Sequence, residues 1–429
     1  MHWQLLRWFY SAVFTCLLPW IFFRMWVRSL RFPAYRRRWL ERLGHIPLPP
    51  LEKVLWLHAV SVGEAVSAIP LVHRLRAQYP QTPILITTTT PTGSERVQAA
   101  FKDILGKQIY HCYMPYDLPW AWHGFFKRIK AKLLILMETE LWPNLLHNCY
   151  QRGLPVLIAN GRLSPRSTQR YHWLGGFMRW MLRPVCGVAA QSALDAKRFE
   201  NLGVAPKAIW ETGNIKFDLQ LPTYLADAGS ELRAELGKAR KVWVAASTHE
   251  GEETIMLDVY AALKNTFPDL LLLLVPRHPD RFNRVAAACQ ERGFQVVRRC
   301  QKQACGIHTD VFLGDTMGEM ALFYAASDIA FVGGSLVPVG GHNLLEPAAL
   351  GLPILTGPQL FNFVAISEML MAADGVTVVA DANALKTALT RLLEDDNLCK
   401  KQGFNAKTVV EENRGALDKL LNIIAPKFA

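Results

Sequence analysis

Short apolar runs alternate along this chain with segments long enough to form a crossover helix, and the alternation begins after residue 50. An apolar run bounded by turn residues is typical of a buried strand, and helical segments between such runs favour parallel pairing. The runs of the first half span residues 54–57, 84–88, 133–137, 156–159 and 188–190. They predict a parallel, doubly wound sheet of the α/β class.

The pattern starts again after Leu221, and it ends in helical segments after Asn383. The runs of the second half span residues 242–246, 270–275, 311–313, 329–332 and 354–355. A chain of 429 residues fits two domains of roughly 150 to 200 residues each. We therefore predict a separate segment at 1–45 and two Rossmann-like domains facing a cleft, at 46–220 and 221–429. The final helices could return to the first domain.

The first 45 residues have a composition of their own. Residues 8–23 carry no charge and extend about 24 Å as a helix, slightly less than a hydrocarbon core of about 30 Å. The flanking Arg7 and Arg24 could reach the lipid head groups. Large residues and arginines follow this stretch, so we predict a single uncleaved membrane anchor. A helix in the plane of the interface is the alternative, because the stretch is short and contains Pro19.

The positive charge of the chain is concentrated near its start. Residues 1–50 carry eight arginines and one acidic residue, Glu41, in a chain of formal charge +12. Arginines after the anchor predict that the two domains lie on the cytoplasmic side of the membrane, with anionic lipids as partners. The eight cysteines form no Cys-x-x-Cys pair, which argues against a zinc site and against a disulfide framework.

The first apolar run is followed by the sequence from His58 to Glu64 (HAVSVGE), which places a carboxylate where a strand turns into a helix. Ser61 and Glu64 match a helix capping box. A carboxylate at a helix N-terminus also stays ionised, which suits a general base that removes a hydroxyl proton. Both roles are open for Glu64, and they are compatible.

Two further turns of the first half carry charged side chains. Residues 138–144 (ETELWPN) follow the third run, and their two glutamates either favour a helix start or serve chemistry. Residues 213–218 (GNIKFD) precede the domain boundary, and Lys216 faces either solvent or the cleft between the domains.

Turns of the second half also lie at predicted strand ends, where ligands bind in open α/β sheets. Residues 247–253 (STHEGEE) offer free N–H groups, Arg277 suits a phosphate, and the glycines of 314–319 (GDTMGE) allow backbone groups to read a base edge. In residues 340–347 (GGHNLLEP), N–H groups can approach a phosphate, and Glu346 could accept two ribose hydroxyl protons. Each turn alone also suits a structural role. Together they predict a nucleotide site.

The absence of several known motifs limits the cofactors and substrates that this chain is expected to bind. The sequence has no Gly-x-x-x-x-Gly-Lys-[Ser/Thr] loop, no strict Gly-x-Gly-x-x-Gly and no His-Glu-x-x-His. It also has no Asp-x-Asp, the usual means of holding a divalent ion on a pyrophosphate donor. A donor with one phosphate needs no such ion. We therefore predict a CMP-activated sugar rather than a UDP-sugar, and no metal site.

A basic stretch indicates the second substrate. Between Leu141 and Leu194 the chain has six arginines and no acidic residue. Such a surface suits an anionic, partly apolar partner, although a solvated basic face has the same composition. No nucleic-acid motif appears and a membrane anchor is unusual in that role, so nucleic acid is not predicted as a partner.

Taken together, the motifs resemble those of the 3-deoxy-D-manno-oct-2-ulosonic acid (Kdo) transferases of Gram-negative lipopolysaccharide synthesis. They are the turns at 58–64, 138–144, 213–218, 276–278 (PRH), 315–319 and 340–343, in the order and rough spacing of that family. The resemblance implies a GT-B glycosyltransferase that is inverting and needs neither metal nor cofactor. It also implies transfer of Kdo from CMP-Kdo to the lipid A precursor lipid IVA, at the cytoplasmic face of the inner membrane.

The same resemblance implies roles for particular residues. Glu64 would be the general base, and Glu140 and Lys216 would stabilise the transition state. The residues implied in CMP binding are Ser247, Thr248, Pro276, Arg277, Met317, Gly318, Glu319, Gly341, Asn343, Leu344, Leu345 and Glu346. The residues expected at the acceptor are Ser61, Gly63, Arg162 and Arg166.

Two other classes of function stay open at this point. One is an enzyme of the same fold that uses a UDP-sugar, such as a lipid A disaccharide synthase or a nucleotide-sugar epimerase, and the anchor argues against the epimerase. The other is a membrane-anchored adaptor that binds lipid without catalysis, in which Glu64 is only a helix cap.

Overall fold

The computed structural model describes residues 2–428 and divides the chain into two compact units. Unit 1 contains the chain up to Asp218 together with the segment from Arg414 onward, and unit 2 contains Leu219–Asn413. Each unit is built around a seven-stranded sheet with parallel pairing. The predicted α/β class with two Rossmann-like sheets is confirmed.

The sheet of unit 1 has the strand order β3-β2-β1-β4-β5-β6-β7. Its strands are β1 (Leu51–His58), β2 (Ile84–Thr88), β3 (Ile109–Tyr113), β4 (Ile129–Met137), β5 (Val156–Gly161), β6 (Val185–Ala190) and β7 (Ile209–Glu211). Its helices are α1 (His2–Arg31), α2 (Trp39–Arg42), α3 (Val62–Gln78), α4 (Pro91–Ala100), α5 (Pro119–Arg128), α6 (Pro143–Gln151), α7 (Pro165–Trp173), α8 (Gly175–Met181), α9 (Ala193–Asn201) and α18 (Ala416–Phe428). A short 3-10 helix, η3 (Ile215–Phe217), follows β7.

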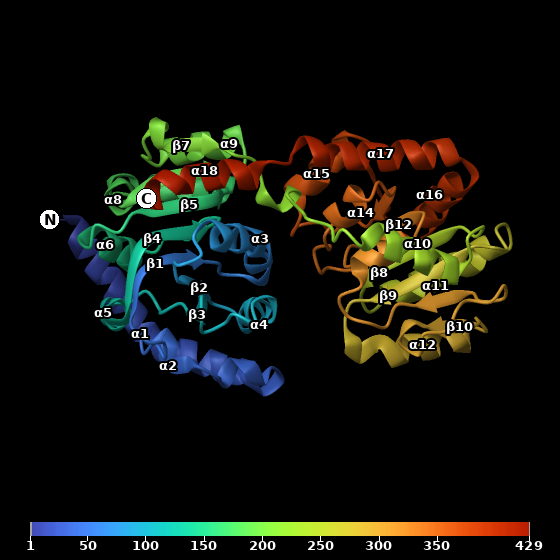
Figure 1. Cartoon of the computed structure of the whole chain (residues 1–429), viewed down its shortest axis with the longest axis horizontal. Helices are drawn as coiled ribbons and strands as arrows, with labels where there is room; N and C mark the ends of the chain where they lie inside the picture. Colours follow the sequence, from blue (N-terminus) through green and yellow to red (C-terminus); the bar gives the residue numbers. More distant parts are fainter. Residues whose placement is uncertain (1, 429) are drawn as a thin grey trace. The chain divides into compact units, whose positions relative to one another are not determined.

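Helices cover both faces of this sheet because alternate strand residues point to opposite faces. Trp56 of β1 packs with Trp122 of α5 on one face, while Leu57 packs with Leu71 of α3 on the other. Figure 1 shows α5 and α6 on one side of β1 and β4, with α3 and α4 on the other. Strands buried on both faces explain why the sequence showed continuous apolar runs rather than alternation.

The last helix, α18, belongs to unit 1. Leu420 and Ile424 of this helix are fully buried against the sheet face that also carries α3. The carboxylate of Asp218 accepts hydrogen bonds from the N–H groups of Gly415 and Leu417, each at 2.6 Å. The points where the chain leaves unit 1 and returns to it are therefore joined directly.

The first helix, α1, has 30 residues, so it is about 45 Å long. By length and composition it could cross a membrane, and only 11% of its most apolar stretch is buried. One side of its first half nevertheless packs on unit 1. Arg7 was expected to reach lipid head groups, but it is 5% exposed and donates a 2.7 Å hydrogen bond to Oδ1 of Asn144. Asn144 in turn donates to Ser11 Oγ at 2.9 Å.

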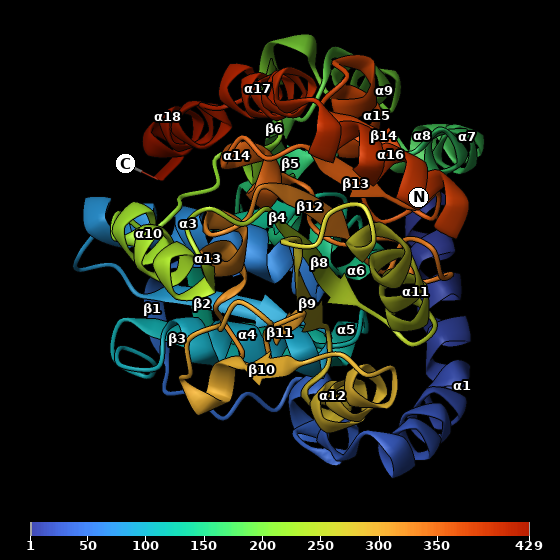
Figure 2. The ribbon, with the colours of Figure 1, turned by 90° about the vertical axis from the view of Figure 1, so that its right-hand side faces the viewer.

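The sheet of unit 2 has the strand order β10-β11-β9-β8-β12-β13-β14. Its strands are β8 (Val242–Thr248), β9 (Leu271–Pro276), β10 (Val296–Arg298), β11 (Val311–Leu313), β12 (Ile329–Val332), β13 (Ile354–Thr356) and β14 (Val376–Val378). Its helices are α10 (Leu225–Leu236), α11 (Glu252–Lys264), α12 (Phe282–Glu291), α13 (Met320–Ala325), α14 (Leu345–Ala349), α15 (Val364–Ala372), α16 (Ala382–Glu394) and α17 (Asp396–Glu412). Figure 2 shows α10 and α13 on one side of β8 and α11 on the other.

Four strands were not predicted, namely β3, β7, β10 and β14. β7, β10 and β14 each have only three residues and pair with a single neighbour. β3 is also an edge strand, and its residues Tyr110 and His111 interrupt the apolar run. Edge strands need less apolar sequence, because one side of the strand has no neighbouring strand.

Candidate active site

The switch point of the first sheet brings three glutamates and a lysine together. After β1 the chain passes to β2 on one side, and the later strand β4 pairs with β1 on the other. Ligands of open α/β sheets bind at such points, beyond the carboxyl ends of the strands. The helix after β1, α3, carries Glu64 in its first turn, and the loop after β4 carries Glu138 and Glu140.

Glu64 lies in the first turn of α3 and is held by backbone groups. Its Oε2 accepts from Val60 N at 2.9 Å and its Oε1 from Ser61 N at 3.3 Å, while Ser61 Oγ accepts from Glu64 N at 3.2 Å. The predicted capping box is therefore present. Burial raises the pKa of Glu64, the N–H of Val60 opposes this effect, and the negative charge of Glu138 adds to it. A buried base with a raised pKa accepts a proton more readily than an exposed one.

Glu138 and Glu140 lie in different surroundings although they are two residues apart. Glu138 adopts a positive φ of 55° and its Oε1 lies 3.3 Å from Nζ of Lys216, which η3 supplies. Glu140 Oε2 accepts a 2.7 Å hydrogen bond from the indole N–H of Trp142. Burial raises the pKa of Glu140 to about 7, and the charges of Glu64 and Glu138 act in the same direction. Glu140 can therefore exchange a proton near neutral pH.

The residues expected at the acceptor lie around this cluster. The hydroxyl of Ser61 is used by the helix cap, and Gly63 is exposed in the same turn. Arg162 is exposed in the loop after β5, where its carbonyl accepts a hydrogen bond from Thr139 Oγ1. Arg166 is exposed at the start of α7. Thus the loops after β4 and β5 are connected, and both arginine side chains are accessible to an anion.

In unit 2 the switch point lies between β8 and β12, which pair directly. A buried carboxylate connects the two loops there. Oε2 of Glu252, which is fully buried, accepts from His249 N at 2.9 Å and from Gly334 N at 2.7 Å. Its Oε1 accepts from the N–H groups of Ser335 and Leu336. The sequence pattern of residues 247–253 does not single out Glu252, yet its carboxylate fixes the loop after β12 against the loop after β8.

Four basic side chains gather at this switch point. His249 Nε2 lies 2.8 Å from His342 Nε2 with the rings stacked, and His278 meets His249 edge to face. Burial lowers the pKa of His342 to about 3, and the charge of Arg277 adds to the effect. The N–H of Arg277 donates to the carbonyl of Thr248, so the loops after β8 and β9 are also joined. Burial also lowers the pKa of His249, so both histidines of the stacked pair favour the neutral form beside Arg277.

The loop at 340–346 presents a carboxylate supported by an amide. Asn343 Nδ2 donates to Glu346 Oε1 at 2.9 Å, and Asn343 Oδ1 accepts from Leu345 N. Burial raises the pKa of Glu346, while Asn343 and the charge of Arg277 oppose the effect. Leu344 and Leu345 are buried, so only their backbone atoms can contact a ligand. The helix that follows, α14, has five residues, so its dipole is weaker than the sequence suggested.

The remaining residues predicted to bind CMP differ in the backbone or side-chain atoms that a ligand could contact. Ser247 has a positive φ of 55°, and Pro276 ends β9. Gly318 has a φ of 89°, and a Cβ there would meet nothing within 4 Å, so its backbone is open to a ligand, and Met317 beside it is exposed. The carboxylate of Glu319 lies 2.8 Å from Arg299 and also accepts from Thr316 Oγ1. Gly341 adopts a φ of 76°, which favours glycine.

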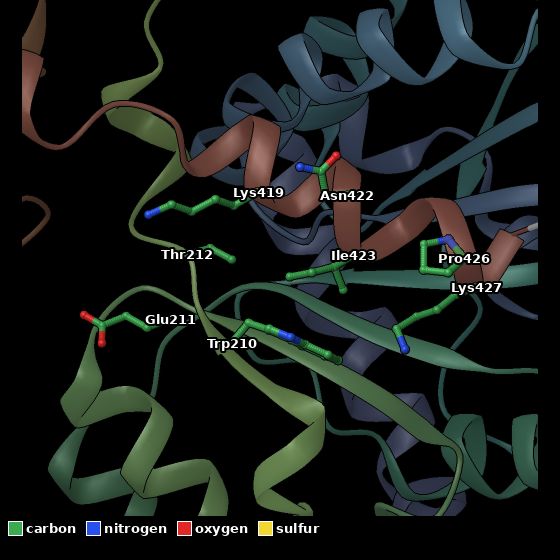
Figure 3. Close-up of a pocket in the computed structure, with 8 residues that line it drawn as sticks. All are labelled: Trp210, Glu211, Thr212, Lys419, Asn422, Ile423, Pro426 and Lys427. Carbon is green, nitrogen blue, oxygen red and sulfur yellow. The ribbon is translucent and has the colours of Figure 1, made fainter.

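A cavity of about 470 Å³ lies elsewhere in unit 1, between the end of β7 and α18. Figure 3 shows Trp210, Glu211 and Thr212 on one wall and side chains of α18, including Lys419 and Lys427, on the other. None of the candidate residues above lines it. Within residues 2–428 there is no group of three or more His, Cys, Asp or Glu side chains placed to hold a metal ion.

Each of the two units matches the sequence model of a known protein family. The sequence model described as 3-Deoxy-D-manno-octulosonic-acid transferase (kdotransferase) matches residues 37–219. The model described as Glycosyl transferases group 1 matches residues 240–409. The first match contains the glutamate cluster, and the second contains the loops joined by Glu252.

Individual proteins agree with these matches. A 3-deoxy-D-manno-octulosonic acid transferase of Haemophilus influenzae is 43% identical over 98% of this chain and 98% of its own length. A 3-deoxy-D-manno-octulosonic acid transferase of Bordetella pertussis is 37% identical over 90% of this chain and 91% of its own. The crystal structure of a UDP-GlcNAc 2-epimerase from Neisseria meningitidis superimposes with a TM-score of 0.55 at 14% identity, covering 87% of this chain and 99% of that one. At that identity the likeness concerns the fold alone.

Proposed function

Since the chain belongs to the 3-deoxy-D-manno-octulosonic acid (Kdo) transferase family, we propose that it moves Kdo from CMP-Kdo to lipid IVA, a lipid A precursor. Membership of this family makes it a glycosyltransferase of lipopolysaccharide synthesis. The observation that carries the proposal is the cluster of Glu64, Glu138, Glu140 and Lys216 at the switch point of the first sheet. An adaptor without catalysis has no need for a cluster in which the charge of Glu138 raises the pKa of both Glu64 and Glu140.

In the proposed reaction Glu64 removes the proton from a hydroxyl group of the acceptor sugar. The hydroxyl oxygen forms a bond to the anomeric carbon of Kdo while the bond from that carbon to the phosphate oxygen of CMP breaks. Attack from the face opposite CMP inverts the anomeric carbon. Each carboxylate oxygen of Glu64 accepts one backbone N–H and has a second lone pair, so a position stays open on each oxygen for the substrate.

Glu140 and Lys216 stabilise the charge that develops on the reacting groups during this step. With a pKa of about 7, Glu140 is partly protonated near neutrality and can donate a hydrogen bond that its ionised form cannot. Lys216 is kept in place by Glu138 and provides a cation for negative charge on the reacting groups.

CMP is assigned to unit 2, at the loops joined by Glu252. The single phosphate of CMP suits a permanent cation and backbone N–H groups, and Arg277 and the glycines at 318 and 341 offer both. The carboxylate of Glu346 can accept hydrogen bonds from ribose hydroxyl groups. The chain has no Asp-x-Asp for a pyrophosphate-bound ion, which favours CMP over UDP and a reaction without metal.

We assign α1 to the membrane surface, with both units on the cytoplasmic side. Large apolar side chains cover its outward side, among them Leu5, Phe9, Trp20 and Phe23. Its inward side is fixed to unit 1 through Arg7 and Asn144. A helix held along a folded unit by buried polar contacts suits the interface plane better than a perpendicular span. Arg24, Arg28 and Arg31 near its end suit anionic head groups.

The decisive test is turnover of CMP-Kdo with lipid IVA in detergent, with and without excess EDTA. We expect a Kdo-bearing product in both conditions, and competition by CMP but not by UDP. A strict requirement for Mg²⁺, or stronger competition by UDP, would support a UDP-sugar donor instead. Binding of lipid IVA without turnover would support the adaptor.

A further inference from the structure

A second cavity of unit 1, about 440 Å³, opens beside the loop that carries Glu140. Its volume lies in the usual range of small-molecule sites, about 300 to 1,000 Å³. Three segments form its walls: the first half of α1, residues 141–143, and residues 171–181 of α7 and α8. The lining residues are Leu6, Phe9, Tyr10, Val13, Leu141, Trp142, Pro143, Tyr171, Leu174, Phe177, Met178 and Met181.

The lining is apolar from rim to floor. Phe177, Met178 and Met181 are buried and form the floor, while Phe9 and Leu174 are exposed at the rim. Among the described side chains that line the cavity, none is charged. The hydroxyl of Tyr10 is hydrogen-bonded to Asp117, and the indole N–H of Trp142 is used by Glu140. Such a cavity offers little to a sugar or a nucleotide and suits a hydrocarbon chain.

One side chain belongs both to this cavity and to the glutamate cluster. Trp142 lines the cavity, donates its indole N–H to Glu140 Oε2 and meets the ring of His58 edge to face at 5.6 Å. His58 ends β1, the strand that leads to Glu64. A chain lying in the cavity would therefore have its polar end near the carboxylates.

The charge around the cavity indicates the polar end of the ligand. Arg166 and Arg170 of α7 are exposed, and the sequence from Leu141 to Leu194 has no acidic residue. The exposed rim on α1 continues the outward apolar side of that helix. A lipid that combines hydrocarbon chains with an anionic sugar fits both features, and a free sugar fits only one.

We propose that this cavity holds one acyl chain of the lipid acceptor, so that α1 forms part of the acceptor site. The inference rests on the proposed function, because it assigns the chain to the acceptor rather than to a membrane phospholipid. Binding of the chain would position the sugar against Glu64 and Glu140. Each buried methylene contributes about a fourfold gain in affinity, the equivalent of about 0.8 kcal/mol.

Two valines of α1 provide a matched test. Val13 lines the cavity and is 44% exposed, whereas Val27 is 45% exposed on the same helix and does not line it. Val13→Trp should fill the cavity and raise KM for tetraacylated acceptor at least about tenfold. Val27→Trp should keep the parent KM. The ratio of KM for deacylated acceptor to KM for acylated acceptor should fall in Val13→Trp alone.

A binding assay separates the cavity from the reaction. Dodecanoic acid with a terminal diazirine is cross-linked to the full-length protein, and the labelled peptides are identified by mass spectrometry. We expect label in residues 141–143 and 171–181 of the parent and of Val27→Trp, and its loss in Val13→Trp. Phe9→Ser, with Phe23→Ser as its control, provides a second pair in case Val13→Trp fails to fold, which melting curves will show.

The outcomes distinguish the two proposals. Label in the cavity with no transfer to any acceptor, deacylated acceptor included, would overturn the proposed function and keep the chain site. A parent-like KM for acylated acceptor in both Val13→Trp and Phe9→Ser would overturn the chain site. Cross-linking of a diazirine phospholipid from vesicles at the same peptides, together with that parent-like KM, would show that a membrane lipid occupies the cavity.

Discussion

Nζ of Lys216 lies 3.3 Å from Oε1 of Glu138, a residue 78 positions earlier in the sequence. The negative charge of Glu138 raises the pKa of both Glu64 and Glu140. Glu138→Gln removes this charge, so both pKa values should fall. The acidic limb of the pH profile of kcat/KM should move to lower pH. A shift to higher pH would show that the release of Lys216 from its partner, and not the lost charge of Glu138, decides the pKa values of Glu64 and Glu140.

Glu64→Gln tests the general base. The amide keeps an oxygen for one backbone N–H but cannot accept the substrate proton, so kcat should fall about 10² to 10⁴-fold. CMP affinity, measured by calorimetry, should not change. The control is Ser192→Ala, which removes the cap of α9 in the same unit and should cost about 1 kcal/mol of stability without such a loss of kcat. Activity of Glu64→Gln within threefold of the parent would exclude Glu64 as the base.

Glu140→Gln should stabilise the protein at alkaline pH. Its folded pKa of about 7 lies above the ordinary value of 4.5, so the folded state holds the proton more tightly than the unfolded state. The stability gained from this proton is complete below pH 4.5 and is lost as the pH rises through 7. Glutamine does not titrate, so its advantage in free energy of unfolding should be about 3 kcal/mol larger at pH 8 than at pH 4. Urea denaturation at the two pH values measures it, and an equal advantage at both would contradict the raised pKa.

Glu346→Ala tests the nucleotide site. Loss of a charged hydrogen bond should weaken CMP binding by about 1 to 3 kcal/mol in calorimetry. Glu368→Ala, which removes an exposed carboxylate of α15 in the same unit, is the matched control. Unchanged CMP affinity in Glu346→Ala would remove this carboxylate from the site.

Deletion of residues 2–31 removes α1 and should affect the two units differently. Unit 1 loses Arg7 and Ser11, two of the partners of Asn144, and one wall of the apolar cavity, so its melting temperature should fall. CMP affinity should stay at the parent value because the donor residues lie in unit 2. Calorimetry and thermal melting test both statements, and a weakened CMP affinity would contradict the second.

Local sequence predicted the features that depend on neighbouring residues. The capping box of Ser61 and Glu64 spans four residues, and the strand before it is a single apolar run, so both were visible. The hydrogen-bond partners of Arg7 could not be predicted from the local sequence. Its contact with Asn144 joins residues 137 positions apart, and an arginine flanking an apolar stretch has the same appearance when it faces lipid.

Long-range contacts also explain what was missed in the candidate sites. The motifs of the sequence indicated Glu140 and Lys216 as site residues. In the structure Lys216 pairs with Glu138 instead, because the turn after β7 places its side chain beside that carboxylate. Glu252 resembled one of several acids at a helix start. Its role depends on N–H groups of residues 334–336, more than eighty positions later, which no local pattern connects to it.

The position of α18 has a consequence for synthesis of the protein on the ribosome. Unit 2 is inserted within unit 1, and the last helix fills one face of the first sheet with Leu420 and Ile424. When residues 1–218 have emerged, the part of that face beside α3 that the last helix covers is still exposed, and it stays so while the next 195 residues are made. The nascent chain thus carries an exposed apolar area of the first sheet that only α18 covers. A ribosome that stops a few codons early would release a protein with an intact unit 2 and an unfinished core in unit 1.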